Sequence, residues 1–222
     1  LIDKDAGGIA WLENKGSEVF VPHDVANLQG PVNEAFVADM NQDGHPDIVY
    51  ATPGAVGWVK NLAGEGFVPQ TALDSGLSNV SALEVADSDG DGDNDVHYAD
   101  SSLAGLGWIK NSGFENFDPQ VVGSQVPSID ALEMADLDMD GLKDLLYASK
   151  SLSAVGWMAN NGLDNFMPPE ILGGELPSVD QLQVADLDHD GDLDIVVASS
   201  EANTSAWLKN NGSEQFVPQG LG

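Results

Sequence analysis

Hydrophobic residues along this chain fall into short runs with a period of two, separated by turn-forming residues. Between Ile129 and Leu172, for example, apolar runs occur around residues 129–137, 145–148, 155–158 and 166–172, and each is bounded by Gly, Asn, Ser, Asp or Pro. Short alternating runs between such breakers are typical of strands and turns. No segment shows the 3.6-residue period of an amphipathic helix. The pattern predicts an all-β fold.

The same unit of four runs recurs along the whole chain. Its most visible marker is a tryptophan, and successive tryptophans are 47, 50, 49 and 50 residues apart. Each tryptophan opens a Trp-x-x-Asn tetrapeptide, which is followed by a glycine and then by Phe-x-Pro. The tryptophans are Trp11, Trp58, Trp108, Trp157 and Trp207. A period of 40–50 residues with four strands per unit indicates the four-stranded antiparallel blades of a β-propeller.

Four complete units begin near Glu34, Ala82, Ala131 and Gln181, and residues 1 to about 25 supply the last three strands of another. We therefore expect one domain with about five blades, four of them complete and the N-terminal one three-stranded. The repeats are expected at about residues 1–28, 29–76, 77–125, 126–175 and 176–222. The pattern leaves open whether this is a five-bladed ring or a segment of a larger propeller.

An acidic loop with the motif D-x-[DN]-x-D-G-x-x-D follows the first strand of each complete unit. Oxygens at positions 1, 3 and 5 can surround a hard cation, glycine at position 6 permits a sharp reversal, position 7 can offer its carbonyl, and Asp at position 9 closes the cage. The predicted ligands of the first two loops are Asp39, Asn41, Asp43, His45 and Asp47, and Asp87, Asp89, Asp91, Asp93 and Asp95. Those of the last two loops are Asp136, Asp138, Asp140, Leu142 and Asp144, and Asp186, Asp188, Asp190, Asp192 and Asp194.

Calcium is the cation that these loops favour, because six or more oxygen ligands suit Ca²⁺ better than Mg²⁺. We predict about four Ca²⁺ ions. An EF-hand begins in a similar way but needs Glu at position 12 and flanking helices. Position 12 is occupied here by Tyr50, Tyr98, Tyr147 and Val197, within predicted strands. A solvated acidic turn would explain one such loop, whereas four loops in one register favour a repeated metal site.

These motifs together resemble a known family. Val-Ala-Asp-x-Asp-x-Asp-Gly-x-x-Asp, an apolar strand and then Gly-Trp-x-x-Asn are similar to the FG-GAP/VCBS repeats of secreted bacterial proteins and of integrin α-subunit propellers. The likeness covers essentially the whole chain, although the Phe-Gly…Gly-Ala-Pro half of that motif is absent. The resemblance implies a calcium-binding β-propeller, and typical relatives form seven-bladed rings.

The net charge and composition of the chain exclude several classes of protein. The chain has 37 acidic residues against seven lysines and no arginine, for a net charge of −30. Nucleic-acid binding needs clustered basic residues, so that class is excluded. Hydrophobic residues make up 42% of the chain, which excludes a disordered acidic tail. No apolar run reaches the ~20 residues that span a bilayer. No nucleophile, zinc-protease or phosphate-loop motif is present, so we expect no enzyme.

Individual aromatic and histidine residues have competing interpretations. The repeated tryptophans could stack on sugars, but their identical place in each unit favours packing between blades. His97 occupies a strand position that Val49, Leu146 and Val196 hold elsewhere, which predicts a core histidine. His45 and His189 lie inside acidic loops and are expected to be exposed.

The function expected from these features is recognition, of the lectin or adhesin kind, outside the cytoplasm or at the cell surface. In a blade, the acidic loops and the Asn-Gly turns lie on one face, and the other connections lie on the opposite face. Because loops on a rigid scaffold carry function, we expect a glycan or protein ligand on the face opposite the calcium loops, or in clefts between blades. The alternative is a structural, assembly or accessory domain of a larger secreted protein, with self-association.

Overall fold

The computed structural model describes residues 1–2, 7–28, 30–100, 105–122, 126, 128–162, 165–172, 176, 178–213 and 215–220. Within these ranges it contains no helix, and its nineteen strands form five antiparallel sheets. It follows that no helix in the described part of the chain could cross a membrane. The all-β prediction is confirmed.

Each sheet is one blade, and we number the blades in chain order. Blade 1 consists of β1 (Gly8–Asn14) and β2 (Phe20–Asn27). Blade 2 consists of β3 (Glu34–Ala38), β4 (Asp47–Thr52), β5 (Ala55–Asn61), β6 (Phe67–Pro69) and β7 (Asp74–Ser75), of which β6 and β7 both pair with β5. Blade 3 consists of β8 (Val80–Ala86), β9 (Asp95–Asp100), β10 (Gly105–Asn111) and β11 (Phe117–Val122). Blade 4 consists of β12 (Ala131–Ala135), β13 (Asp144–Ser149), β14 (Ala154–Met158) and β15 (Glu170–Leu172). Blade 5 consists of β16 (Gln181–Ala185), β17 (Asp194–Ser199), β18 (Thr204–Asn210) and β19 (Phe216–Gly220).

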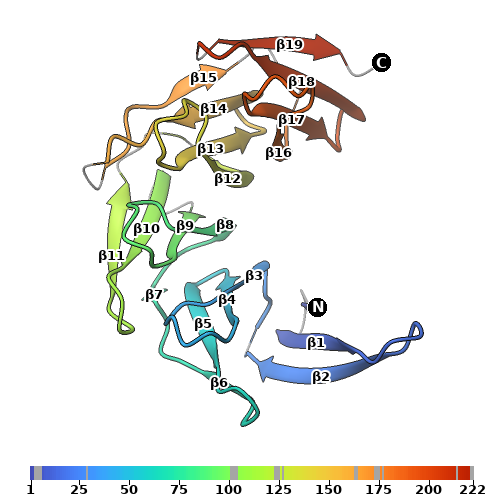
Figure 1. Ribbon diagram of the computed structural model, residues 1–222, viewed down its shortest axis with the longest axis vertical. Coiled ribbons are helices and arrows are strands. Elements are labelled where there is room, and N and C mark those ends of the chain that lie inside the picture. The colour runs from blue at the N-terminus through green and yellow to red at the C-terminus, as the bar shows by residue number, and fades with distance from the viewer. Residues whose placement is uncertain are drawn as a thin grey trace.

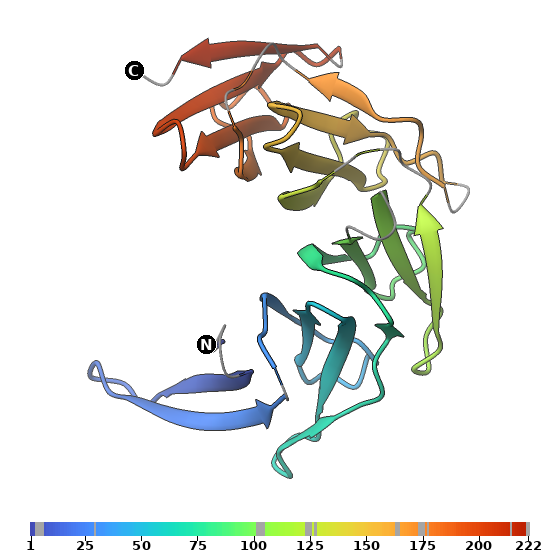
Figure 2. The same ribbon diagram turned by 180° about the vertical axis from the view of Figure 1, so that it is seen from behind.

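The blades follow one another along an open arc (Figures 1 and 2). The first strands β3, β8, β12 and β16 lie on the inner side of the arc and contact one another in sequence. The last strands lie on the outer side. Blade 1 and blade 5 occupy the two ends of the arc. This radial arrangement of four-stranded antiparallel sheets is that of β-propeller blades, as predicted.

Blade 1 was predicted to have three strands. Among the described residues, its hairpin is joined to the N-terminal segment by a bridge between Ile2 and Ile9 and by two backbone hydrogen bonds between Leu1 and Ala10. Residues 3–6, in which the rest of the predicted strand would fall, lie outside the described residues. The same holds for residues 29, 123–125 and 173–175, at three of the predicted repeat boundaries, so these limits stay a prediction.

The hydrophobic core lies between neighbouring blades. Trp58, Trp108 and Trp157 are only 3–4% exposed. Each meets the edge of a phenylalanine ring on the next blade, with ring centroids 5.4 Å apart for Trp58–Phe117, 6.2 Å for Trp108–Phe166 and 6.4 Å for Trp157–Phe216. The predicted packing role is confirmed for these three. Trp11 differs, because it is 40% exposed and stacks on His23 of its own blade at 4.6 Å.

The glycine before the tryptophan is required by a close contact in three blades. Gly57, Gly107 and Gly156 pair across the sheet with Tyr50, Tyr98 and Tyr147. A Cβ atom on these glycines would lie 2.6, 2.1 and 2.1 Å from the tyrosine ring. In blade 5 the corresponding pair is Ala206 and Val197, where a smaller partner leaves room for a methyl group.

Candidate cation sites and clefts between blades

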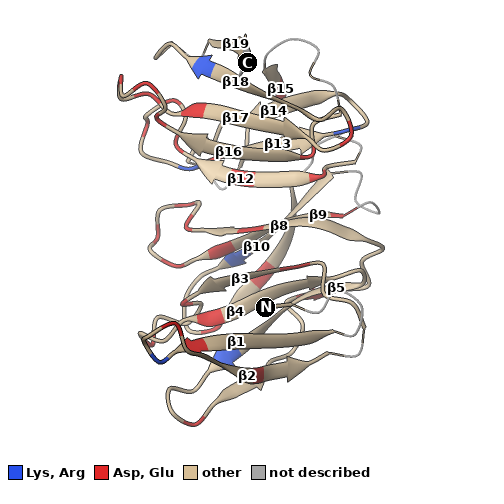
Figure 3. Cartoon of the chain, turned by 90° about the vertical axis from the view of Figure 1, so that its right-hand side faces the viewer, with Lys and Arg blue, Asp and Glu red and all other residues tan. Residues whose placement is uncertain are grey.

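The four acidic loops occupy equivalent places in blades 2 to 5. Loop 1 (39–47), loop 2 (87–95), loop 3 (136–144) and loop 4 (186–194) each join the inner strand of a blade to its second strand. They project from one side of the arc, at the left in Figure 3, where acidic residues gather. The repeat therefore places four similar carboxylate clusters on one face of the protein.

The carboxylate at position 1 closes each loop on the glycine at position 6. One of its oxygens accepts a hydrogen bond from the glycine amide, at 2.8 Å in loop 1, 3.1 Å in loop 2, 3.0 Å in loop 3 and 3.2 Å in loop 4. These glycines have φ between 85° and 98°, a conformation that other residues rarely adopt. A Cβ atom on Gly141 or Gly191 would meet nothing within 4 Å, so conformation, and not space, requires glycine there.

Positions 3 and 5 also use one oxygen to hold the backbone. In loop 2, Asp89 Oδ1 accepts the amide of Asp91 at 3.1 Å, and Asp91 Oδ1 accepts the amide of Asp93 at 2.9 Å. The same bond from position 7 to position 5 recurs in the other loops, with His45, Leu142 and Asp192 as donors. In loops 2 and 3 this leaves the second oxygen of the position-5 carboxylate available to a cation, whereas in loop 1 it accepts a hydrogen bond from Asn41 and in loop 4 it lies 3.2 Å from Lys209 Nζ. The predicted use of the position-7 carbonyl stays a prediction.

The aspartate at position 9 is fully buried in every loop, at Asp47, Asp95, Asp144 and Asp194. In loop 3, Asp144 Oδ2 accepts the amide of Leu137 at 3.0 Å and Oδ1 accepts the amide of Asn160 at 2.8 Å. Equivalent pairs of bonds recur in the other three loops. Burial raises the pKa of Asp95 and of Asp144 to about 6. Position 9 therefore ties each loop to the third strand of its own blade, a structural role in addition to the predicted one.

The carboxylates converge in three of the loops. Three side-chain oxygens lie within 4.8 Å of one another in Asp87–Asp89–Asp91, in Asp136–Asp138–Asp144 and in Asp186–Asp188–Asp194. Asp136 Oδ1 is buried and has no hydrogen-bond partner among the described residues. An unpaired buried carboxylate oxygen is costly unless a cation meets it. An oxygen-only donor set of this charge fits a hard cation such as Ca²⁺, and these residues would hold it.

Loop 1 has one negative charge less among its predicted cation ligands at positions 1, 3 and 5. Asn41 replaces the position-3 aspartate, and its amide nitrogen donates to Asp43 Oδ2 at 3.0 Å. Within the described ranges, loop 1 therefore presents a mixed amide and carboxylate set, whereas loops 2, 3 and 4 present carboxylates alone.

The asparagine of Trp-x-x-Asn connects loops 2, 3 and 4 to the loop of the blade before, a role that was not predicted from the sequence. Asn160 Nδ2 donates to the carbonyl of Lys143 in loop 3 at 3.0 Å and to the carbonyl of Ser88 in loop 2 at 2.6 Å. Asn111 does the same for loops 2 and 1, and Asn210 for loops 4 and 3. The signal for this role was the asparagine's recurrence in every unit.

His97 and its partners form a buried polar group beside loop 2. His97 Nε2 lies 3.0 Å from Ser88 Oγ, which donates to Asp95 Oδ2 at 2.5 Å. All three residues are at most 2% exposed, so no substrate can reach the serine. Burial lowers the pKa of His97 to about 3, which keeps it neutral. The predicted core placement is confirmed, although Nδ1 has no partner among the described residues.

Glutamates line the inner side of the arc. Glu84 of β8 and Glu133 of β12 occupy equivalent places, three residues before their loops, and Gln183 of β16 is the third member of the row. Gln183 Nε2 donates to Glu133 Oε2 at 3.1 Å. Burial, followed by the negative charge of Glu133, raises the pKa of Glu84 to about 7. The row therefore carries a carboxyl group that titrates near neutral pH.

Clefts on the outer rim recur at successive blade junctions. A cavity of about 370 Å³ between blades 3 and 4 is lined by Trp108, Lys110, Asp118, Gln120, Asn165 and Phe166, among others. A cavity of about 320 Å³ between blades 2 and 3 is lined by the equivalent Trp58, Gln70, Asn116 and Phe117. Each combines an apolar floor with carboxamide groups from two neighbouring blades.

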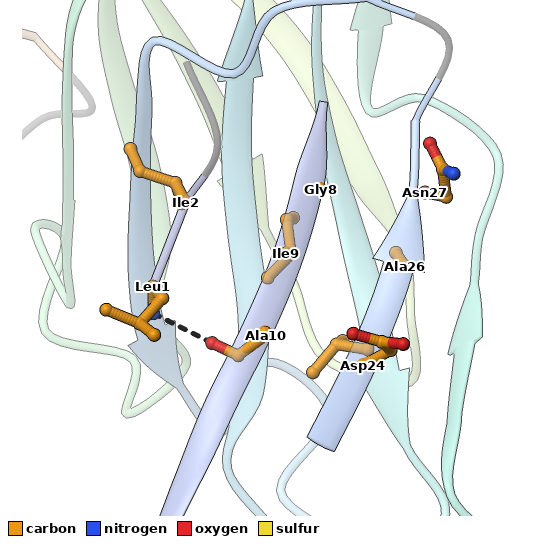
Figure 4. A pocket seen from close by; sticks show the side chains of 9 residues that line it. Leu1, Ile2, Gly8, Ile9, Ala10, Asp24, Ala26 and Asn27 are labelled. Carbon is orange, nitrogen blue, oxygen red and sulfur yellow. Dashed lines mark hydrogen bonds between the residues drawn. The ribbon is translucent and has the colours of Figure 1, made fainter. Parts of the chain in front are cut away.

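Two further hollows involve blade 1. One, of about 620 Å³, lies between Trp11, His23 and Phe67. The other, of about 490 Å³, lies along the N-terminal segment, where the Leu1 amino group donates to the carbonyl of Ala10 at 2.7 Å (Figure 4). The second hollow has mainly small and apolar lining residues, so it offers fewer polar contacts than the rim clefts.

Comparison with solved structures supports the fold. A lectin from Agrocybe aegerita, described as recognising non-reducing terminal N-acetylglucosamine, is 22% identical with a TM-score of 0.69, over 98% of this chain and 60% of the lectin. An auxiliary nutrient binding protein from Bacteroides ovatus is 10% identical with a TM-score of 0.56, over 86% of this chain and 48% of its own. The V. cholerae biofilm matrix protein Bap1 is 18% identical with a TM-score of 0.55, over 97% and 35%. The chain thus spans less than two thirds of each of these proteins.

Comparison with sequences identifies the repeats. No curated protein matches the chain. The profile of the FG-GAP-like repeat matches residues 39–98 and 136–197, which together make up more than half of the chain. Each matched segment begins at the first aspartate of one acidic loop and ends in the second strand of the following blade. The chain belongs to the FG-GAP-like repeat family.

Proposed function

We propose that this chain is a non-catalytic, calcium-dependent recognition module that binds carbohydrate in the rim clefts between blades. The observation that carries the proposal is the recurrence of one cleft, with the same residue types, at two successive junctions. Ligand sites are commonly concave, largely apolar and several hundred Å³ in volume, with a few polar groups that set orientation. The rim clefts fall in that range of volume, and most of their lining is polar.

The chemistry of the larger cleft suits sugar hydroxyls, which both donate and accept hydrogen bonds. Gln120 Nε2 donates to Asp118 Oδ2 at 2.7 Å, so an amide and a carboxylate stand side by side at the cleft wall. Amides and carboxylates beside the Trp108 and Phe166 rings form a donor and acceptor set that matches a saccharide. The structural likeness to a lectin supports the same proposal.

This placement differs from the face opposite the loops, where the sequence analysis put the ligand. The rim clefts are favoured because they have defined walls from two blades and recur with the repeat. Several connections on the opposite face, including residues 101–104, lie outside the described residues.

Calcium in the loops would hold the cleft walls in register. Each pair of blades that forms a rim cleft is also joined by an asparagine that bonds the loops of both blades. Ca²⁺ would offset the repulsion among carboxylates that, at ~4 Å and an effective dielectric of ~20, costs about 4 kcal/mol per pair before screening. Because extracellular fluid supplies calcium at concentrations that such sites need, we place the protein outside the cytoplasm or at the cell surface.

The test is a glycan array probed with the full chain in calcium and in EDTA. We expect binding to a restricted group of saccharides that is lost in EDTA. Gln120→Ala should weaken the signal, because it removes a cleft amide, and Gln219→Ala is the matched control. Gln219 pairs with Trp207 of blade 5 as Gln120 pairs with Trp108, but it lies at the end of the arc.

Absence of any glycan signal in calcium, or equal effects of the two substitutions, would contradict carbohydrate binding in the rim clefts. Defined oligomers in a mass measurement, together with no glycan binding, would favour the structural or assembly role instead. These two outcomes separate the recognition proposal from its alternative.

A further inference from the structure

Lysines stand beside the acidic loops at one fixed place in the repeat. The residue two positions after the blade tryptophan is Lys60 in blade 2, Lys110 in blade 3 and Lys209 in blade 5, but Ala159 in blade 4. The chain has only seven lysines, so three at this place are a large share of its positive charge.

Two of these lysines contact the loop of their own blade. Lys110 Nζ lies 2.7 Å from Asp89 Oδ2 in loop 2, and the Asp89 side chain is only 8% exposed. Lys209 Nζ pairs with Asp188 and lies 3.2 Å from Asp190 Oδ2 in loop 4. Both ammonium groups also lie over the indole of the same strand, at 5.7 Å from the Trp108 ring and 6.0 Å from the Trp207 ring. Each ammonium is thus held by its own tryptophan against predicted cation ligands.

Loops 1 and 3 differ in informative ways. Lys60 is bound to Glu115 of blade 3 at 2.5 Å, so its closest carboxylate is not a loop residue. Loop 3 has Ala159 at the lysine position, and it is the loop in which Asp136 Oδ1 is buried without a partner in the described structure. An oxygen without a partner therefore occurs in the loop whose blade has no lysine two positions after the tryptophan. Loop 3 has a lysine of its own, Lys143, whose charge acts on Glu84 and Glu133 of the inner row.

We propose that Lys110 and Lys209 are built-in counter-cations that compete with calcium for the position-3 carboxylates, so that loop 3 fills at lower calcium concentration than loops 2 and 4. This inference rests on the calcium-binding part of the proposed function. A carboxylate oxygen that turns to a divalent ion must leave the ammonium, and the ammonium then lies close to a second positive charge. The lysine stabilises the metal-free loop and weakens the metal-bound one. Both effects lower calcium affinity.

By the same argument, Lys110 and Lys209 should stabilise their loops in the metal-free protein. Three or more carboxylates in one loop repel one another, and an ammonium group within hydrogen-bond distance offsets part of that repulsion. Loops 2 and 4 each contain five aspartates, whereas loop 3 contains four. Lys110 and Lys209 thus accompany the two loops with five aspartates, as expected if their role is to balance charge before calcium binds.

The experiment is a calcium titration of the full ¹⁵N-labelled chain, followed by NMR through the amides of Gly92, Gly141 and Gly191. These position-6 glycines donate to the position-1 carboxylates, so each amide reports on its own loop. In the unmodified chain we expect the Gly141 midpoint at lower calcium than the midpoints of Gly92 and Gly191.

Substitutions then assign the effect to the lysines. Lys110→Met keeps the aliphatic stem over Trp108 and removes the charge, so the Gly92 midpoint should fall about fivefold, as loss of one ion pair implies. Lys209→Met should do the same for Gly191. Ala159→Lys is the reverse test, and it should raise the Gly141 midpoint by a similar factor. In each case the other two glycines serve as internal controls.

An unchanged Gly92 midpoint in Lys110→Met, or a shift to higher calcium, would overturn the inference while leaving calcium binding intact. A chain in which no glycine amide responds to calcium would instead refute calcium binding itself. Melting in EDTA provides a second readout, because Lys110→Met and Lys209→Met should lower the melting temperature only when calcium is absent. If one variant does not fold, the other variant and Ala159→Lys still decide the question.

Discussion

The side-chain amide of Asn160 donates a 2.6 Å hydrogen bond to the carbonyl of Ser88, which lies 72 residues earlier in the chain. Asn160 lies two residues after β14, the third strand of blade 4, and Ser88 is the second residue of loop 2 in blade 3. The same asparagine donates to Lys143 of its own loop and accepts the amide of Gly162 through Oδ1. One buried side chain thus joins two candidate cation sites and a turn.

Asn160→Ala should destabilise the fold markedly. The substitution leaves the buried carbonyls of Ser88 and Lys143 without this donor, and each unsatisfied group costs about 1–3 kcal/mol. Asn61→Ala is the matched control, because Asn61 is more exposed and its amide nitrogen bonds only the Pro46 carbonyl within the described structure. Chemical denaturation in calcium measures both. Equal losses of unfolding free energy would show that the link between blades contributes nothing.

Chelation should lower the melting temperature of the full chain, and millimolar calcium should restore it. A ligand at 100 times its Kd stabilises the folded state by about 2.7 kcal/mol per site, provided that the unfolded chain does not bind it. The convergent oxygens of loops 2, 3 and 4 are the expected source of this stabilisation. Differential scanning fluorimetry in EDTA, calcium and magnesium is sufficient. Identical curves in all three conditions would remove the calcium assignment.

Much of the fold could be predicted because it repeats. Trp58, Trp108 and Trp157 recur with one spacing, and a period-two pattern surrounds each of them, so the blades and their inner strands were located within a few residues. The acidic loops could also be predicted from the sequence, since Asp, Asn and Gly at fixed positions reflect local backbone chemistry. Residues adjacent in sequence determined both features.

Contacts between distant residues could not be predicted in the same way. The bond from Asn160 to Ser88 depends on how two blades stack, and no local pattern encodes that distance. The left-handed conformation at position 4 of the loops was also missed, because Gln42, Gly90, Met139 and His189 share no side-chain type. Trp11 has the sequence context of the other tryptophans but a different exposure, which reflects its place at the end of the arc.

Gly156→Ala should cost about 1–3 kcal/mol of stability, because a methyl group there would lie 2.1 Å from the Tyr147 ring in a packed site. The chain contains its own compensating pair, since blade 5 has Val197 and Ala206 at the corresponding register. Adding Tyr147→Val to Gly156→Ala should therefore recover part of the loss. A double-mutant cycle from urea denaturation measures the coupling. Strict additivity would mean that the ring and the glycine do not constrain each other.

Stability should fall as pH rises from about 5 to about 8, in part because of Glu84. Its pKa is raised from 4.5 to about 7 in the folded chain by burial and by Glu133. The folded state therefore binds a proton that the unfolded state has already lost across this interval, so deprotonation disfavours folding. Glu84→Gln should raise the melting temperature at pH 8 and change it little near pH 4.5. Glu65→Gln, at an exposed position, is the control. Asp95 and Asp144 titrate in both the Glu84→Gln variant and the unmodified chain, so the difference between the two melting temperatures, followed against pH, reports on Glu84. A difference that stays constant with pH would show that Glu84 does not titrate in this range and that its charge is already compensated on the inner side of the arc.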